Sequence, residues 1–112
     1  MSAIDLSYLE RLYKGDHARI GAWVEIFLEE IPLRMEEMAQ CVQRGDPAGL
    51  AALAHELKPQ AYYLGAPRML EVLQRVGERT RCDASTPCHE EVGELHAACA
   101  EVAAELRAIF NP

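Results

Sequence analysis

Hydrophobic residues recur at steps of three and four along most of the chain, which is the spacing of one face of an α-helix. The clearest stripe runs from Ile20 to Val42 and stays in phase across Pro32. We therefore expect one long helix with a kink at the proline rather than an end there. No useful stretch alternates with a period of two, so the pattern predicts an all-α fold.

Capping and turn residues divide this pattern into five predicted helices. Asp5 and Asp16 are placed to cap the first and the second helix. The tripeptide Gly45-Asp46-Pro47 supplies a glycine past one helix end, an N-cap and a proline for the next first turn. We expect helices at residues 5–14, 16–44, 47–64, 67–81 and from 87 onward. The 112 residues should then form a single domain, an antiparallel four-helix bundle with a short leading helix.

The same periodicity predicts which side chains of the last three helices point inward and places His55 outside. At about 100° per residue, His55 lies roughly 140° to 160° from Leu50 and Leu57 on its helix. We therefore expect its imidazole to face solvent. The inward residues are expected to be Leu50, Leu53, Leu57, Ala61 and Leu64, then Leu70, Leu73 and Val76, then Val92, Leu95, Cys99, Val102, Leu106 and Ile109.

The residues that share the face of His55 are small or apolar, whereas an ordinary solvated face carries glutamate, lysine and glutamine. Such a tract around one nucleophilic side chain is typical of a docking surface. Imidazole is largely uncharged at neutral pH, so an exposed histidine can react without a separate base. Lys58, one turn further, can reach a phosphoryl group attached to His55. The expected partner contacts are Ala48, Ala51, Ala52, Pro59, Tyr62 and Arg68.

Charge and composition exclude several classes of function. The formal net charge of −7 argues against a nucleic-acid binder, because a phosphate backbone repels an acidic protein. Residues 58–81 carry five basic against two acidic residues, and this local basic region suits an acidic partner site. No apolar run approaches the roughly 20 residues of a membrane span. Without a glycine-rich phosphate loop or paired metal-binding carboxylates, the chain is expected to bind neither ATP nor Mg²⁺ and not to phosphorylate itself.

The cysteines favour a reduced protein in a cytoplasm. Cys41 and Cys99 fall at core positions of helical patterns, as reduced thiols commonly do. A disulfide between Cys82 and Cys88 is left open at roughly one chance in ten. We expect a monomer, since all the apolar stripes can be buried internally. A first methionine and an end at Pro112 favour a free-standing protein over an excised domain.

The stretch Ala54-His55-Glu56-Leu57-Lys58, followed by Leu64-Gly65-Ala66, resembles the signature of the histidine-containing phosphotransfer (HPt) family. Gly65, a turn residue, falls ten residues past the histidine, as in that pattern. The resemblance implies a bundle that accepts a phosphoryl group from a receiver-domain aspartyl-phosphate and passes it on. It implies that His55 is phosphorylated on Nε2 with support from Lys58. Its partners would be response-regulator receiver domains and a hybrid histidine kinase, and Mg²⁺ would belong to the receiver.

Two positions depart from the family pattern. Pro59 replaces the usual glycine after the lysine, which removes the amide that would bond the His55 carbonyl and predicts a local kink or a loosened turn beside His55. Gly77 stands 22 residues after the histidine, where many members place a glutamine that orients the imidazole. Gln74, one turn earlier, is not assigned that role.

Two other interpretations remain open. The first is a docking module that keeps the fold and binds a receiver or kinase without being phosphorylated. The departures from the family pattern at Pro59 and Gly77 are the reason to retain this interpretation. The second is a structural bundle with a C-terminal metal site. The spacing of the candidate ligands matches no zinc ribbon or finger, so the probability of a metal site is roughly 5 per cent. These candidates are Cys82, Cys88, His89, His96 and Cys99.

Overall fold

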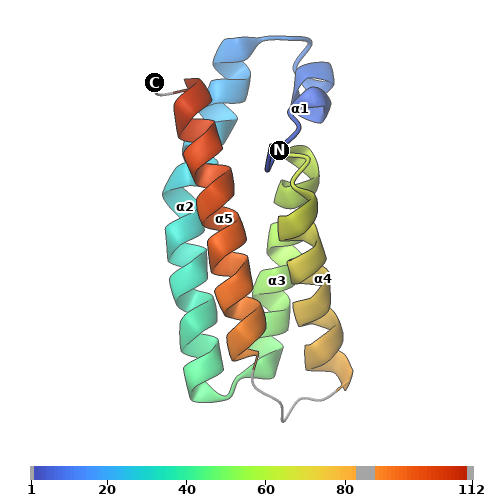
Figure 1. Ribbon diagram of the computed structural model, residues 1–112, viewed down its shortest axis with the longest axis vertical. Coiled ribbons are helices and arrows are strands. Elements are labelled where there is room, and N and C mark those ends of the chain that lie inside the picture. The colour runs from blue at the N-terminus through green and yellow to red at the C-terminus, as the bar shows by residue number, and fades with distance from the viewer. Residues whose placement is uncertain (1, 83–87, 111–112) are drawn as a thin grey trace.

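The computed structural model describes residues 2–82 and 88–110, and within these ranges every regular element is a helix. Consecutive long helices run in opposite directions along the bundle, and the short first helix packs at one end (Figure 1). The predicted all-α fold class is confirmed. The helices are α1 (Ser7–Leu12), α2 (His17–Arg44), α3 (Pro47–Tyr63), α4 (Pro67–Cys82) and α5 (His89–Phe110).

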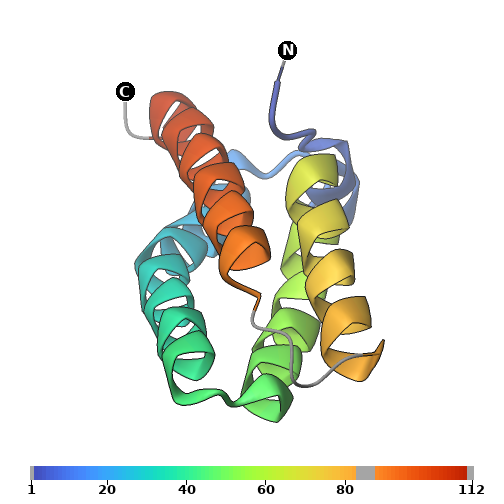
Figure 2. The same ribbon diagram turned by 60° about the horizontal axis from the view of Figure 1, so that its bottom comes forward.

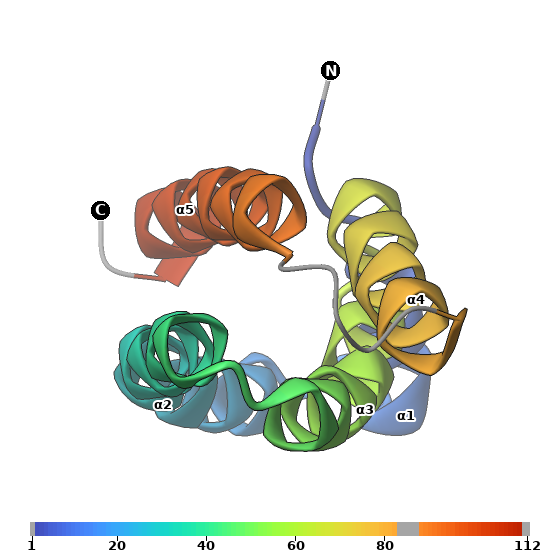
Figure 3. The same ribbon diagram turned by 90° about the horizontal axis from the view of Figure 1, so that it is seen from below.

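The four long helices form a ring in the order α2, α3, α4, α5 when the molecule is seen along its axis (Figure 3). Each neighbouring pair in this order packs together, including α2 with α5. At 1.5 Å per residue α2 is about 42 Å long, close to the longest dimension of the molecule, 45 Å. The turn between α2 and α3 lies at the same end as the last turn of α4 (Figure 2). Because α3 and α4 are neighbours in the ring, and α2 and α5 are neighbours as well, the α3–α4 side of the bundle lies opposite the α2–α5 side.

The turn between α2 and α3 has the chemistry that its sequence predicts. Gly45 adopts a left-handed conformation (φ 67°) and ends α2. The carboxylate of Asp46 accepts a hydrogen bond of 2.9 Å from the Gly49 amide and caps α3, with Pro47 in the first turn. This bond, and a second one from Arg44, lower the pKa of Asp46 below its ordinary value. The start of the helix that carries His55 is therefore well fixed.

The turn between α3 and α4 is held by the N-terminal segment. Gly65 has φ 56°, and a Cβ at this position would overlap the Asp5 carbonyl oxygen. The Asp5 amide donates a hydrogen bond of 2.9 Å to the Leu64 carbonyl. Gly65 is thus required both by its backbone conformation and by close packing.

The prediction that Asp5 caps α1 is wrong. The helix begins at Ser7 with Leu6 in the N-cap position, and no side chain caps it. Asp5 instead accepts a hydrogen bond of 3.0 Å from the Ser7 amide, two residues on. The reason is tertiary, because the backbone bond to Leu64 holds residue 5 against the α3–α4 turn. By contrast, the predicted cap at Asp16 is confirmed by its bond to the Arg19 amide.

The predicted core is mostly confirmed, with shifts at its edges. Leu53 and Leu70 are half-buried rather than inward, while their neighbours Ala54 and Met69 are fully buried. Because α3 and α4 each have a helix on both sides, the buried sector of each is centred one position away from these leucines. Ile109 is 47% exposed, since it lies in the last turn of α5.

Further predictions concern Pro32, the last loop, the cysteines and a membrane span. α2 continues through Pro32, as predicted. The expected helix start at residues 86–87 lies outside the described residues. All four cysteines are free thiols, so the disulfide between Cys82 and Cys88 is not present. No helix among the described residues is long and apolar enough to cross a membrane.

Candidate functional site

His55 lies in the middle of α3 and faces solvent. Two nearby residues of α3 show which way the helix faces: Ala54, one residue before His55, and Leu57, two residues after it, are 0% and 1% exposed. Alanine, leucine and lysine are strong helix formers, so this part of α3 has both the propensity and the amphipathic pattern of a surface helix. The predicted outward orientation of the histidine is confirmed.

The surface around His55 is made of small and apolar side chains. Ala48, Ala52 and Pro59 are exposed and Ala51 is half-buried. Tyr62 is 63% exposed and adds a large aromatic ring to the same helix face. A face of this composition can be approached closely by another protein's backbone. That these residues contact a partner remains a prediction.

Tyr62 points outward because the next residue, Tyr63, fills the inward position. The ring of Tyr63 stacks on that of Tyr8 at 5.4 Å between centroids and meets Trp23 edge-on at 5.9 Å. Adjacent residues of a helix point about 100° apart. The aromatic cluster of α1, α2 and α3 therefore leaves Tyr62 available on the surface of α3, as the sequence predicts.

Lys58 lies at the boundary between α3 and α4. It is half-buried, and its ammonium would be only 3.6 Å from a Cβ at Gly77 on α4. This separation is ordinary van der Waals contact, so the ammonium lies against α4 at Gly77. Lys58 makes no ion pair with any residue that the structure describes. Lys58 thus places a cation at the α3–α4 boundary, one turn along α3 from His55.

Most of the basic residues of α4 are paired inside the domain. Arg75 bonds Glu94, and Arg79 bonds Glu91, which is only 5% exposed. The bond between Arg75 and Glu94 raises the pKa of the guanidinium and lowers that of the carboxyl. The interpretation of residues 58–81 as one basic region facing a partner is thus wrong for these two arginines, because glutamates of α5 neutralise them.

Arg68 forms the third pair of this series. Its Nη1 lies 2.9 Å from the Glu101 Oε1 on α5. Arg68 is also in the first turn of α4, whereas His55 is eight residues before the end of α3, roughly 12 Å along the helix axis. The structure therefore does not bring Arg68 together with His55 and Lys58. Its role as a partner contact remains a prediction.

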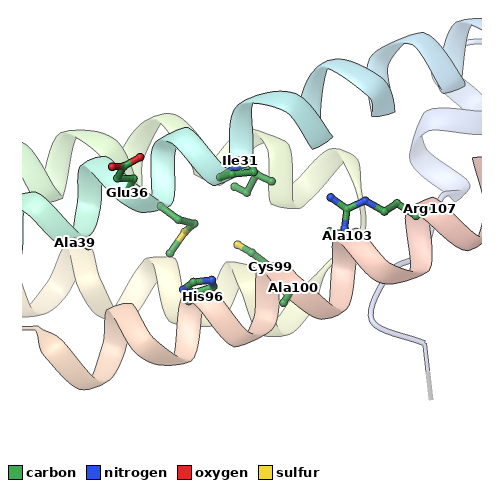
Figure 4. Close-up of a pocket in the computed structure, with 10 residues that line it drawn as sticks. Ile31, Glu36, Ala39, His96, Cys99, Ala100, Ala103 and Arg107 are labelled. Atoms are coloured by element: carbon green, nitrogen blue, oxygen red, sulfur yellow. The ribbon is translucent and has the colours of Figure 1, made fainter. Parts of the chain in front are cut away.

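A groove of about 340 Å³ lies between α2 and α5, on the side opposite to the α3–α4 face. His96 and Cys99 point into it from α5 (Figure 4). Burial raises the pKa of Cys99 to about 12, so its thiol stays protonated at neutral pH and is a poor metal ligand. No group of three metal-ligating side chains occurs among residues 2–82 and 88–110. The described residues give the metal-site interpretation no support.

The fold is a bundle of four long helices, and His55 lies exposed on a face of small and apolar side chains. A family model of the Hpt domain matches residues 22–105, which is 84 of the 112 residues, and the chain belongs to the Hpt domain family. No curated protein and no solved structure gives a significant match. Membership in this family implies a part in histidine phosphotransfer in two-component signalling.

Proposed function

We propose that the protein is a phosphorelay intermediate in which His55 accepts a phosphoryl group from one receiver domain and passes it to another. The observation that carries this proposal is the exposed imidazole on a face of small, apolar residues, with Lys58 one turn further along the same helix. The exposed alanines at 48 and 52 and the ring of Tyr62 form the surface on which the receiver docks. Arg68 is kept as an outlying contact of that surface.

The transfer reaction needs little from this chain beyond a nucleophile in the right place. Nε2 of the neutral imidazole attacks the phosphorus of an aspartyl-phosphate, forming a P–N bond while the acyl P–O bond breaks. The bonding electron pair leaves with the aspartate carboxylate, and the phosphoimidazolium that forms can lose its Nδ1 proton to water. Lys58 offsets the charge on the phosphoryl oxygens. In this proposal the receiver supplies Mg²⁺ and the acidic pocket, and this chain supplies no kinase activity.

The experiment is phosphoryl transfer from a phosphorylated receiver domain to the purified chain. We expect acid-labile, base-stable phosphate on the wild type and none above background on His55→Gln. The matched control is His96→Gln, which removes an exposed histidine from the opposite α2–α5 groove and should leave the label unchanged. Label that persists on His55→Gln would contradict the site. Binding of the receiver without any label would favour the docking module instead.

A further inference from the structure

We propose that the outer face of α5 binds α5 of a second copy of this chain, so that two bundles pair through their last helices as an antiparallel dimer. This proposal goes beyond phosphoryl transfer, and it replaces the monomer that the apolar stripes alone predict. It starts from a row of exposed residues on α5 that no other helix of the bundle covers. The row consists of six residues spaced by three and four: Glu90, Gly93, Ala97, Ala100, Ala104 and Arg107.

The spacing and composition of this row suit a second helix. Its steps of three, four, three, four and three are the a/d pattern of a helix pair, and they run for about 26 Å along α5. Between its two charged ends the row holds only glycine and alanine, whereas a solvated helix face carries long polar side chains. Small residues at such positions let two helices approach to about 8 Å between their axes. The shape of the face therefore fits a helix better than a small molecule.

The charges at the two ends of the row identify the second helix. Glu90 begins the row and Arg107 ends it, and neither forms an ion pair with any residue that the structure describes. When a second copy of α5 runs antiparallel, Glu90 of each copy meets Arg107 of the other, and both ends are neutralised. A parallel pair would instead set like charges against each other at both ends. The row is thus complementary to itself in one orientation.

The register that pairs these charges also brings the small residues together. With Glu90 level with Arg107 of the second copy, Gly93 is level with Ala104, and Ala97 is level with Ala100. The two-fold axis then passes between Ala97 and Ala100, as a closed dimer with identical surfaces requires. Every position of the row therefore has a partner of suitable size or charge.

The acidic residues on the α4 flank of the row do not oppose this pairing. Glu94 and Glu101 would approach the same two residues of the second copy. Each already bonds an arginine of α4, because Glu94 pairs with Arg75 and Glu101 with Arg68. Their charges are therefore compensated within each bundle.

The groove between α2 and α5 borders the other flank and gives a second, independent reason to expect a cover. Ala100 and Arg107 belong both to the row and to the lining of this groove of about 340 Å³. The thiol of Cys99, only 3% exposed, points into the groove (Figure 4). In the antiparallel pair, His96 of the second copy comes level with residues 99–103 on this flank. The second copy thus covers the groove as well as the row.

The dimer leaves the phosphoryl-transfer surface free. α3 lies diagonally across the ring of helices from α5 (Figure 3), so His55 of each copy stays exposed. A contact of one helix against another is small for a protein interface, and we expect a dissociation constant on the order of 10 μM.

The test measures the molar mass of the full chain by sedimentation equilibrium from about 1 μM to about 1 mM, a range that brackets the expected dissociation constant. A thiol reductant is present, which excludes disulfide-linked dimers. The variants are Glu90→Arg, Arg107→Glu, the double variant that carries both changes, and Ala100→Glu. Ala22→Glu is the matched control, because it adds the same charge at an exposed alanine of α2 outside the row and the groove. Circular dichroism checks that the helical content is unchanged.

We expect the wild type and Ala22→Glu to dimerise alike, and Ala100→Glu to weaken the dimer by roughly tenfold or more, since a charged side chain enters the centre of the contact. Each single charge reversal should weaken it about fivefold, because both end pairs become like-charge contacts. The double variant should return to within about twofold of the wild type, because the pairs form again with their signs exchanged.

A wild type that stays monomeric at every concentration contradicts the proposal, and so does a dimer that Ala100→Glu leaves intact. A double variant as weak as the single reversals contradicts the antiparallel register. Labelling of His55 by a phosphorylated receiver domain should be equally fast in Ala100→Glu and the wild type. A slower rate in Ala100→Glu but not in Ala22→Glu would show that the row binds the receiver rather than a second copy, and would contradict the proposal. Failure of the proposed function is seen separately, as label that persists on His55→Gln.

Discussion

The two sides of α4 use the same type of residue for opposite purposes. On the side that faces α5, Arg68, Arg75 and Arg79 each meet a glutamate. On the side that faces α3, Lys58 lies against Gly77 and Arg81 stands exposed, with no ion pair to any described residue. The first set of charges is paired within the bundle, and the second has no partner among the described residues. A count of basic residues along the sequence cannot separate these two sets.

The register between α4 and α5 explains how the separation arises. Successive arginines at steps of seven and four meet glutamates at steps of seven and three in the opposite direction, as antiparallel helices require. The buried residues Met69, Val72, Leu73 and Val76 set the rotation of α4, and the pairs fit that rotation. With its arginine row turned to α5, the helix presents Gly77 to α3. The ion pairs thus lie on the α5 side of α4, away from the surface of His55.

The largest expected effect, on the free energy of unfolding, comes from the side of α4 that faces α5. Glu91→Gln removes the buried partner of Arg79, and we expect it to lower the free energy of unfolding by about 2 kcal/mol, since a charged hydrogen bond is lost and the half-exposed arginine rehydrates only in part. Chemical denaturation measures this loss. The exposed neighbour Glu90→Gln is the control and should change stability by less than about 0.5 kcal/mol. A transfer rate that falls together with the stability of Glu91→Gln would break the distinction between the two sides.

Pro59, on the surface of α3 near His55, offers a substitution that should raise the free energy of unfolding rather than lower it. Pro59→Ala restores an amide that can bond the His55 carbonyl, and we expect it to raise the free energy of unfolding by about 1 to 2 kcal/mol. The gain is smaller than a full proline penalty because proline also restricts the unfolded chain. Thermal unfolding measures the gain, and the rate of phosphoryl transfer should stay within twofold. Destabilisation by this substitution would show that the ring of Pro59 is needed by the packing of α3.

Substitution of Lys58 should lower the transfer rate and leave stability unchanged, the reverse of what is expected for Glu91. Lys58→Ala removes the cation beside Gly77, and we expect transfer from a receiver to slow about fivefold, equivalent to roughly 1 kcal/mol. The unfolding free energy should change by less than about 0.5 kcal/mol, because no described ion pair is broken. Arg19→Ala, which removes an exposed charge from α2, is the control. An unchanged transfer rate in Lys58→Ala would remove the lysine from the site.

The smallest expected effect is a pH dependence of the stability that the Arg75–Glu94 pair contributes between α4 and α5. The bond from Arg75 lowers the pKa of Glu94 below its ordinary value of 4.5, so this carboxylate stabilises the fold above pH 4.5 and loses that contribution as the pH falls through its lowered pKa. Glu94→Gln removes the titrating group. The difference in Tm between wild type and Glu94→Gln should therefore shrink as the pH is lowered from 6 to 3. A difference that stays constant over this range would contradict the assigned linkage.

The sequence was sufficient for features set by local chemistry. The cap at Asp46 and the left-handed Gly45 follow from the residues themselves, and the outward direction of His55 follows from helical periodicity. Features that depend on how helices meet were missed. Asp5 failed as a cap because of a bond to distant Leu64, and the position of Lys58 depends on the register of α3 against α4.

Exposure by itself does not single out His55, since all four histidines are exposed. His17 stacks on Phe110 with 4.8 Å between ring centroids, and His89 begins α5. His96 lies at the α2–α5 groove, where the buried thiol of Cys99 is its neighbour. What distinguishes His55 is its setting of small side chains with Lys58 one turn along the helix, and the choice among the histidines is therefore the point to test.

The most direct test is to locate the phosphoryl group on the chain after transfer from a receiver domain. Digestion at neutral to alkaline pH, followed by tandem mass spectrometry with a fragmentation method that keeps the P–N bond intact, identifies the modified residue. The account predicts a phosphoryl group on His55 and on no other histidine. A phosphoryl group found on His17, His89 or His96 instead would contradict it.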